Sequence, residues 1–174
     1  MISHINNYCV RRLAFALKIS DKDITSIFAL VNYRLQLNEV KGYLKKEDDA
    51  LFVPIPDYLF ILFLDGLIGK YRGIRKEDRE LSQAQRVKQA KSQTLSNNLI
   101  LNKLKITFTL TSDALIELLA LADFRISKGE MSAFFRKPTH RNYRQCGNQL
   151  IRNLLTGITQ DLQSDKPIIQ LKIN

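Results

Sequence analysis

Apolar residues recur along most of the chain at intervals of three and four positions, which is the spacing of one face of an α-helix. Val10, Leu13 and Leu17 follow it near the start of the chain. The pattern predicts helices over about residues 7–18, 21–31, 98–109, 112–122 and 142–162, with a further helix that begins near Pro56 and contains residues 58–68.

Residues that favour helix starts and ends support this interpretation. Ser20 with Asp23 has the form of a capping box, in which each side chain bonds the backbone N–H of the other residue. Ser127 and Glu130 form a clearer example. They predict a short third helix, which we expect to end at Pro138 because proline supplies no N–H donor.

The most apolar segment, residues 58–64, has the composition of a buried strand as well as of a helix. The aligned segment described below, residues 149–155, has helical spacing with Arg152 and Asn153 on a polar side. We therefore predict helices for both segments. The apolar surplus of residues 58–64 then predicts contact with a second surface, either on the other copy of the repeat described below or on another subunit.

The chain also repeats itself. At an offset of 91, residues 7–68 align with residues 98–159 without a gap, and ten of the 62 aligned residues are identical. Apolar residues coincide at 25 positions, whereas chance alone gives about 16. The sequence therefore predicts an all-α fold of two tandem homologous four-helix modules with pseudo-two-fold symmetry.

This repeat defines the expected domain organisation. The first helical repeat covers residues 7–69 and the second covers residues 97–162. Residues 70–96, rich in Lys, Arg, Glu, Gln and Ser, form either a charged linker or an exposed helix. The tail, residues 163–174, contains several apolar residues that suit either a short edge strand or an apolar strap over the core.

Charge is distributed unevenly over these parts. The chain of 174 residues has 27 Lys and Arg against 17 Asp and Glu, a net charge of +10. Residues 1–69 are neutral, whereas residues 70–96 and 97–174 each carry +5, and residues 131–160 contain no carboxylate. Such an excess of positive charge favours a polyanionic partner.

A cluster of cations and rings in the second repeat is the candidate nucleic-acid site. Arg and Lys bind phosphates, and aromatic rings stack on bases. The second and third helices of a repeat also resemble a helix-turn-helix. The alternative is structural: Asn142, Arg144 and Arg152 would bond backbone carbonyls and pair with carboxylates of the first repeat. The candidate residues are Arg136, Lys137, His140, Arg141, Tyr143, Arg144 and Arg152.

The segment that runs from Arg136 to Arg152 and on to Gly157 resembles the signature of the YehS-like family, small bacterial cytoplasmic proteins built from a repeated domain of unknown function. Residues 43–48, 66–68 and 124–130 share the resemblance, which spans about residues 7–160. The family usually has an acidic residue where this chain has Asn148. The resemblance implies a duplicated helical domain, and it implies no particular reaction, substrate or cofactor.

Signatures of catalysis and of metal binding are missing from the sequence, which has two histidines and two cysteines. Cys146 with His140 is the one candidate nucleophile and base. Cys146 aligns with Ile55, however, which favours a buried structural thiol. We therefore expect a protein that is not an enzyme and has no metal or organic cofactor.

The cysteines and the absence of a long apolar run indicate the compartment. Cys9 and Cys146 are expected to be reduced thiols, as in cytoplasmic proteins. A membrane span needs about 20 apolar residues, and the longest apolar run has seven. We expect a cytoplasmic protein that binds RNA or DNA and no membrane. The alternative is a protein–protein interaction or regulatory module, including a homodimer.

Overall fold

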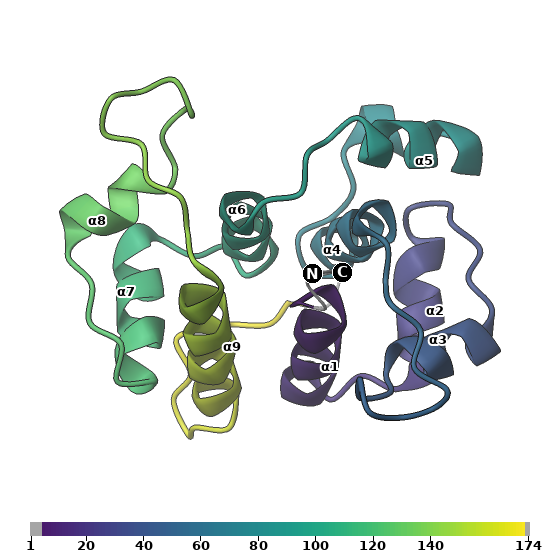
Figure 1. The fold of residues 1–174 in the computed structure, drawn as a ribbon, viewed down its shortest axis with the longest axis horizontal. Helices are drawn as coiled ribbons and strands as arrows, with labels where there is room; N and C mark the ends of the chain where they lie inside the picture. Colours follow the sequence, from purple (N-terminus) through teal and green to yellow (C-terminus); the bar gives the residue numbers. More distant parts are fainter. Residues whose placement is uncertain (1–4, 173–174) are drawn as a thin grey trace.

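The computed structural model describes residues 5–172, and within that range it contains helices, turns and loops but no strand. The fold is therefore all-α, as the spacing of apolar residues predicts (Figure 1). The elements are α1 (Ile5–Leu17), α2 (Asp21–Ala29), α3 (Leu37–Tyr43), α4 (Asp57–Tyr71), the 3-10 turn η1 (Lys76–Asp78), α5 (Gln83–Lys91), α6 (Asn97–Thr107), α7 (Ser112–Leu121), α8 (Lys128–Ala133) and α9 (Asn148–Leu162).

The helices α1–α4 recur as α6–α9 at the predicted offset of 91 residues. The backbone repeats in detail, because the non-glycine residues with positive φ form two pairs at this offset, Lys18 with Thr109 and Asn32 with Asp123. Each of these residues follows a helix end in the left-handed conformation, which closes the last turn of the helix. The sequence therefore specifies one module twice.

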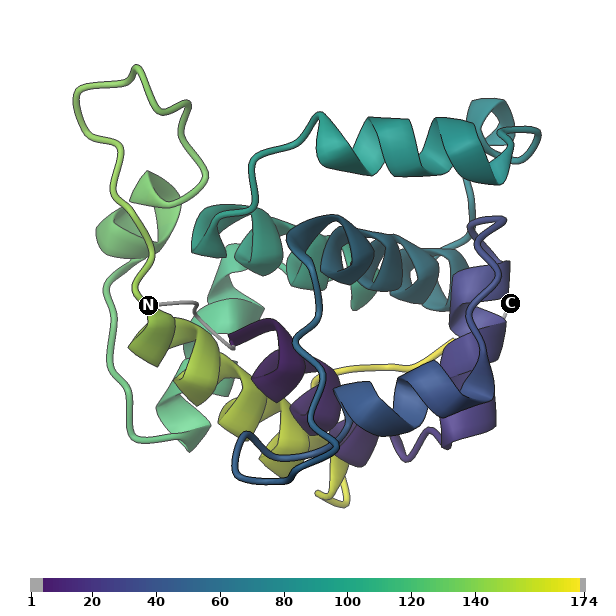
Figure 2. The same cartoon turned by 45° about the vertical axis from the view of Figure 1, so that its right-hand side comes forward.

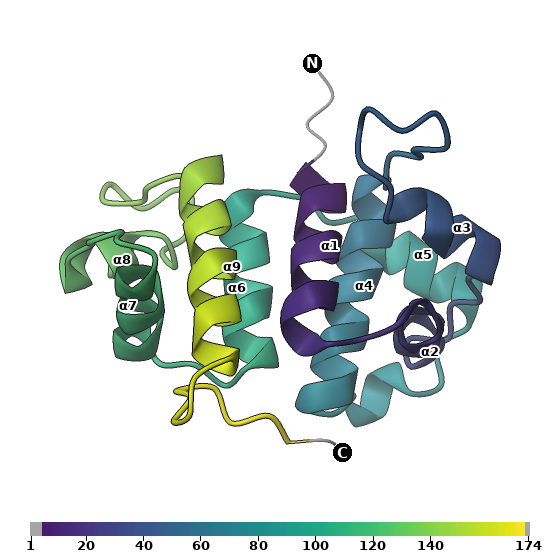
Figure 3. The same ribbon diagram turned by 90° about the horizontal axis from the view of Figure 1, so that it is seen from below.

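The two modules pack against each other across the pseudo-two-fold axis. The first helix of each module packs mainly on the fourth helix of the other module, α1 on α9 and α6 on α4. These four helices form the middle of the molecule, and α2 with α3 and α7 with α8 lie on its two flanks (Figure 3). One hydrophobic core runs through both modules, so neither module completes its core alone.

The apolar surplus of α4 lies in this shared core. Phe60, Ile61, Leu62 and Phe63 are each at most 1% exposed. The helix packs against α2, α5 and α6, so apolar side chains are buried around most of its circumference. Of the two surfaces predicted for these side chains, the contact with the other module is therefore observed, through α6.

The linker is partly ordered as helix. Its helix α5 lies along α4 (Figure 2), with Ala90 and Arg86 buried, and η1 precedes it. An unbroken helix from residue 76 to residue 91 is not formed, because the chain leaves the helical conformation after η1 and starts again at a capping box of Ser82 and Gln85.

The tail forms a strap rather than a strand over the residues described. Ile169 is 1% exposed and belongs to the core. The backbone N–H groups of Ile168 and Ile169 donate to the carboxylate of Asp161 at 2.7 and 2.9 Å, which fixes the chain as it leaves α9. Residues 173–174 of the predicted tail lie outside the described residues.

Candidate nucleic-acid interface

The segment that connects α8 to α9, residues 134–147, is the centre of the candidate site, and we call it the basic loop. The third helix ends earlier than Pro138, at Ala133. The reason is a long-range bond: the carbonyl of Ala133 accepts the N–H of Arg144 at 3.2 Å and is therefore not used to continue the helix. The predicted start of the fourth helix at residue 142 is also wrong, because α9 begins at Asn148.

The basic loop is closed at its base by Asn98 of α6. The side-chain amide of Asn98 donates to the carbonyls of Phe134 and Arg144, and its oxygen accepts the N–H of Cys146 at 2.9 Å. Asn7 makes the matching three bonds in the first module. Asn7 and Asn98 are identical residues in the alignment of the two repeats, but the alignment did not reveal that these asparagines position the loops.

The preceding asparagine of each module holds the start of the fourth helix. Asn97 donates to the side-chain oxygen of Asn148 at 2.7 Å, and Asn6 donates to the carboxylate of Asp57 at 2.9 Å. An amide oxygen therefore accepts the same bond as a carboxylate. Asn148 therefore takes the place in the second module that Asp57 has in the first.

Six of the seven predicted site residues come together on the basic loop. Lys137 and Arg141 are exposed, and among the described residues neither side chain has a hydrogen-bond or ion-pair partner. The guanidinium of Arg136 donates to the carbonyl of Asn142 at 3.2 Å, which holds it across the loop. The other members on the loop are His140, Tyr143 and Arg144.

The contacts of Arg144 differ from those of the structural alternative. Arg144 lies 3.8 Å from Glu130 of its own module, not from a carboxylate of the first module. Both side chains are largely exposed, and such a pair contributes little to stability. The backbone N–H of Ser127 and its hydroxyl lower the pKa of the Glu130 carboxyl, with a smaller effect of Arg144. Glu130 thus stays ionised and neutralises part of the charge of Arg144.

Arg152 does not belong to this group. It lies on α9, half-buried, with its guanidinium carbon 4.2 Å from the centre of the Tyr8 ring of α1. This cation–π contact joins the two modules. We therefore correct the predicted set: Arg152 has a structural position, because the helix turns it toward the other module instead of toward the basic loop.

In the predicted pair of Cys146 and His140, the thiol lacks the properties of a nucleophile. Burial raises the pKa of the Cys146 thiol to about 12, so the thiolate is scarce at neutral pH. The Nδ1 atom of His140 accepts the N–H of Asn142 at 3.0 Å. The buried position that the alignment with Ile55 favoured is the one observed.

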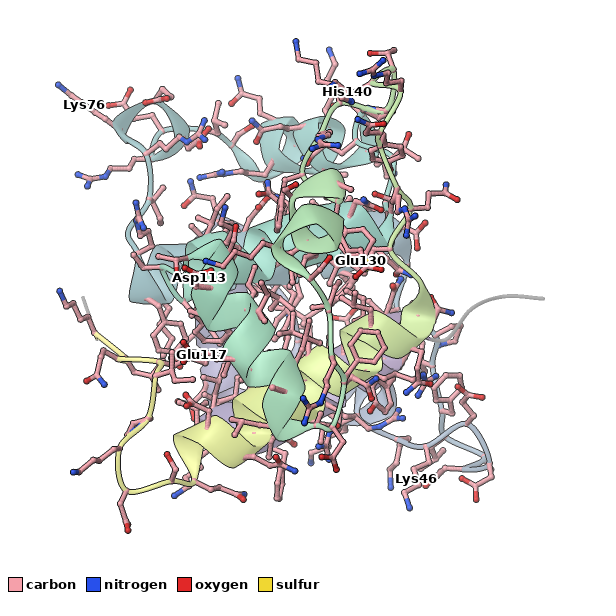
Figure 4. All side chains as sticks on the ribbon, turned by 90° about the vertical axis from the view of Figure 1, so that its left-hand side faces the viewer. Lys46, Lys76, Asp113, Glu117, Glu130 and His140 are labelled. Carbon is pink, nitrogen blue, oxygen red and sulfur yellow. The ribbon has the colours of Figure 1, made fainter. Side chains whose placement is uncertain are left out.

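The basic loop and the linker lie on the same side of the molecule. Figures 1 and 2 both show the linker helix α5 along the upper edge of the molecule and the basic loop rising at the left end of the same edge. In Figure 4, Lys76 of the linker and His140 of the basic loop occupy the upper edge, and Lys46 in the matching loop of the first module lies at the opposite end. Both segments with excess positive charge therefore face one direction.

This geometry defines a class of protein: an all-helical, internally duplicated chain whose second copy carries a basic loop. A family model described as "Protein of unknown function (DUF1456)" matches residues 6–73 and again residues 97–163, so the chain belongs to this family. The uncharacterized protein YehS of Escherichia coli (strain K12) is 33% identical over 154 residues, which cover 88% of this chain and 94% of that protein. The predicted resemblance is confirmed. No solved structure matches the chain.

Two other classes of site are absent from residues 5–172. No helix there is long and apolar enough to span a membrane. Within the same range, no group of three or more His, Cys, Asp and Glu side chains is arranged to hold a metal ion.

The clamp formed by Asn98 gives a direct prediction. Asn98→Ala removes three hydrogen bonds to the backbone, and at roughly 1 kcal/mol each the protein should lose about 2 to 4 kcal/mol of unfolding free energy. Urea denaturation measures this loss, and trypsin should cut the basic loop faster. Asn102→Ala on the exposed face of α6 is the control, with a change within about 0.5 kcal/mol. Equal stability of the two variants would contradict the clamp.

Proposed function

We propose that this protein binds nucleic acid through the basic loop and does not catalyse a reaction. The observation that supports the proposal is the shared orientation of the linker and the basic loop, the two parts that contain the excess positive charge of the chain. Positive charge gathered on one side raises the local concentration of a polyanion and speeds its association.

The side chains of the basic loop suit contacts with a sugar-phosphate backbone. Lys137 and Arg141 keep their hydrogen-bond donors free, and the exposed His140 and half-buried Tyr143 place rings between the cations. Cations interleaved with rings are typical of surfaces that bind single strands, where bases stack and phosphates pair with cations. We therefore propose a single strand as the preferred ligand.

A contact through a helix in a DNA groove has less support. The helix α8 has six residues, fewer than two turns, and the basic loop rises beyond it. A recognition helix has to expose several side chains along one groove. We assign the contact to the basic loop, and the resemblance to a helix-turn-helix plays no part in the proposal.

The alternative of a protein-interaction module rested on the apolar surplus of α4. Those side chains are buried in the core that the two modules share, so they offer no surface to a partner. We also propose a cytoplasmic location, because both cysteines are unpaired and buried, and reduced thiols are typical of that compartment.

Fluorescence anisotropy with labelled oligonucleotides tests the proposal. Single-stranded RNA, single-stranded DNA and duplex DNA of equal length are titrated with the full chain at about 50 mM salt. We expect micromolar binding to at least one single strand and weaker binding to the duplex. Failure of all three to bind more tightly than about 1 mM would refute nucleic-acid binding.

A further inference from the structure

A second basic feature lies at a distance from the basic loop in the sequence. A cleft of about 930 Å³ lies between α4, the linker and α6. The chain turns at Gly73, whose φ is +101°, after the end of α4, and then returns as α5 along α4. None of the residues that line the cleft belongs to the basic loop. Its volume is within the range of small-molecule sites.

Cations outnumber carboxylates in this cleft. Five cations line it, together with the carboxylates of Asp65 and Asp78. Lys103 pairs with Asp65, and Arg86 lies 4.0 Å from Asp78. The three remaining cations have no carboxylate partner among the described residues, which leaves an excess of three positive charges. These unpaired cations are Arg72, Arg75 and Arg79.

Arg86 supplies the most specific indication of a ligand. The residue is 3% exposed and lines the cleft. Its guanidinium donates to the backbone carbonyl of Asp78, but its Nε–H is buried without any acceptor among the described residues. A buried donor that lacks a partner costs free energy, so an anion that accepted this N–H would be bound more strongly.

Apolar side chains also line the cleft. They belong to Val31, Ile68, Ile74 and Ile106, of which the three isoleucines are partly exposed. Arginines and aliphatic side chains in one cleft together fit a molecule with an anionic group and an organic part. A phosphate or carboxylate can accept two parallel bonds from one guanidinium.

We propose that this cleft binds a small organic molecule that carries a diphosphate group. The three unpaired arginines match the charge of about −3 that a diphosphate ester carries near neutral pH, since each phosphate group bears between one and two charges. The Nε–H of Arg86 donates to a phosphate oxygen, and the organic part of the ligand lies on the isoleucines. The residues that line this site lie outside the basic loop, although the arginines of the linker also contribute to the positive charge that supports the nucleic-acid proposal.

Isothermal titration calorimetry tests this proposal with inorganic pyrophosphate and with adenosine diphosphate as probes. We expect both to bind below about 1 mM at 50 mM salt. The variant R75A/R79A removes two exposed cations whose side chains make no hydrogen bond among the described residues, so its fold is retained. It should weaken both probes at least tenfold. The matched control K137A/R141A should bind both probes as the natural chain does.

Two results would overturn the cleft proposal. The first is the absence of binding by either probe, and the second is equal affinity of R75A/R79A and the natural chain for both probes. If neither probe binds and R75A/R79A weakens the binding of an oligonucleotide, the cleft is part of a nucleic-acid surface instead. Failure of the basic loop shows itself separately, as unchanged oligonucleotide affinity in K137A/R141A.

Discussion

Gly157→Ala should destabilise the protein by about 3 kcal/mol or more. A Cβ atom built on Gly157 would lie 1.8 Å from the carbonyl oxygen of Leu118, so α9 would have to move away from α7. This oxygen belongs to the backbone, and no change of rotamer relieves the clash. Thermal or urea denaturation followed by circular dichroism measures the loss, because both helices contribute to the signal.

A control for this substitution exists in the same module. Gly129 lies in α8, and the nearest atom to a Cβ built there is the Ser127 hydroxyl oxygen at 3.9 Å. Gly129→Ala should therefore leave stability unchanged or raise it by up to about 1 kcal/mol, because alanine favours the helix. If Gly157→Ala were as stable as Gly129→Ala, the close packing of α9 on α7 would be wrong.

Removing two cations from the basic loop should produce the largest change in binding. K137A/R141A eliminates two cations of the loop whose side chains have no partner among the described residues, and each charge-assisted contact contributes about 1 to 1.5 kcal/mol. We expect oligonucleotide affinity to fall about 30-fold or more at 50 mM salt, measured by fluorescence anisotropy. Circular dichroism should show an unchanged helix content, because neither side chain bonds the rest of the described structure.

The control for this variant removes the same charge from the first module. Lys41 and Lys46 are exposed, and Lys46 aligns with Lys137 in the matching loop. That loop lies at the opposite end of the molecule from the basic loop (Figure 4). K41A/K46A should change the affinity less than threefold. Equal losses in both double variants would mean that net charge, and not the basic loop, determines binding.

Most of the helices were predictable because they bury an apolar face at helical spacing. The repeat added the order of the helices, and paired positions such as Lys18 and Thr109 have the same backbone conformation. Helix ends in the second module were predicted less well. The end of α8 depends on the bond from Arg144 to Ala133, which joins residues that are distant in the sequence. A local pattern contains no information about such a bond.

The packing of α1 on α9 and of α6 on α4 could also not be predicted from the sequence pattern. The spacing of apolar residues in α1 shows that one face is buried but does not show which helix covers it. In the folded chain, α1 packs mainly on α9 of the other module. The position of Arg152 follows from this packing, since its contact with Tyr8 exists only because α1 and α9 are neighbours. For this reason, charge alone could not separate Arg152 from the basic loop.

The candidate site was thus predictable where its residues are consecutive. The basic loop is a continuous segment, and its charge is visible in the sequence. The cleft could not be found in that way, because its residues come from α4, the linker and α6 and meet only in the folded chain. Arg86 in particular lies in a charged and polar segment of the sequence, which predicts an exposed side chain, but the residue is buried.

The salt dependence of oligonucleotide affinity tests nucleic-acid binding by the basic loop most directly. Four cations on the loop, each contributing about 0.7 to 0.9, predict that the logarithm of the association constant falls with the logarithm of salt concentration with a slope of about −3. K137A/R141A should reduce the magnitude of this slope by about 1.5. Affinity that does not change with salt, or a slope that the variant leaves unchanged, would contradict binding through the basic loop.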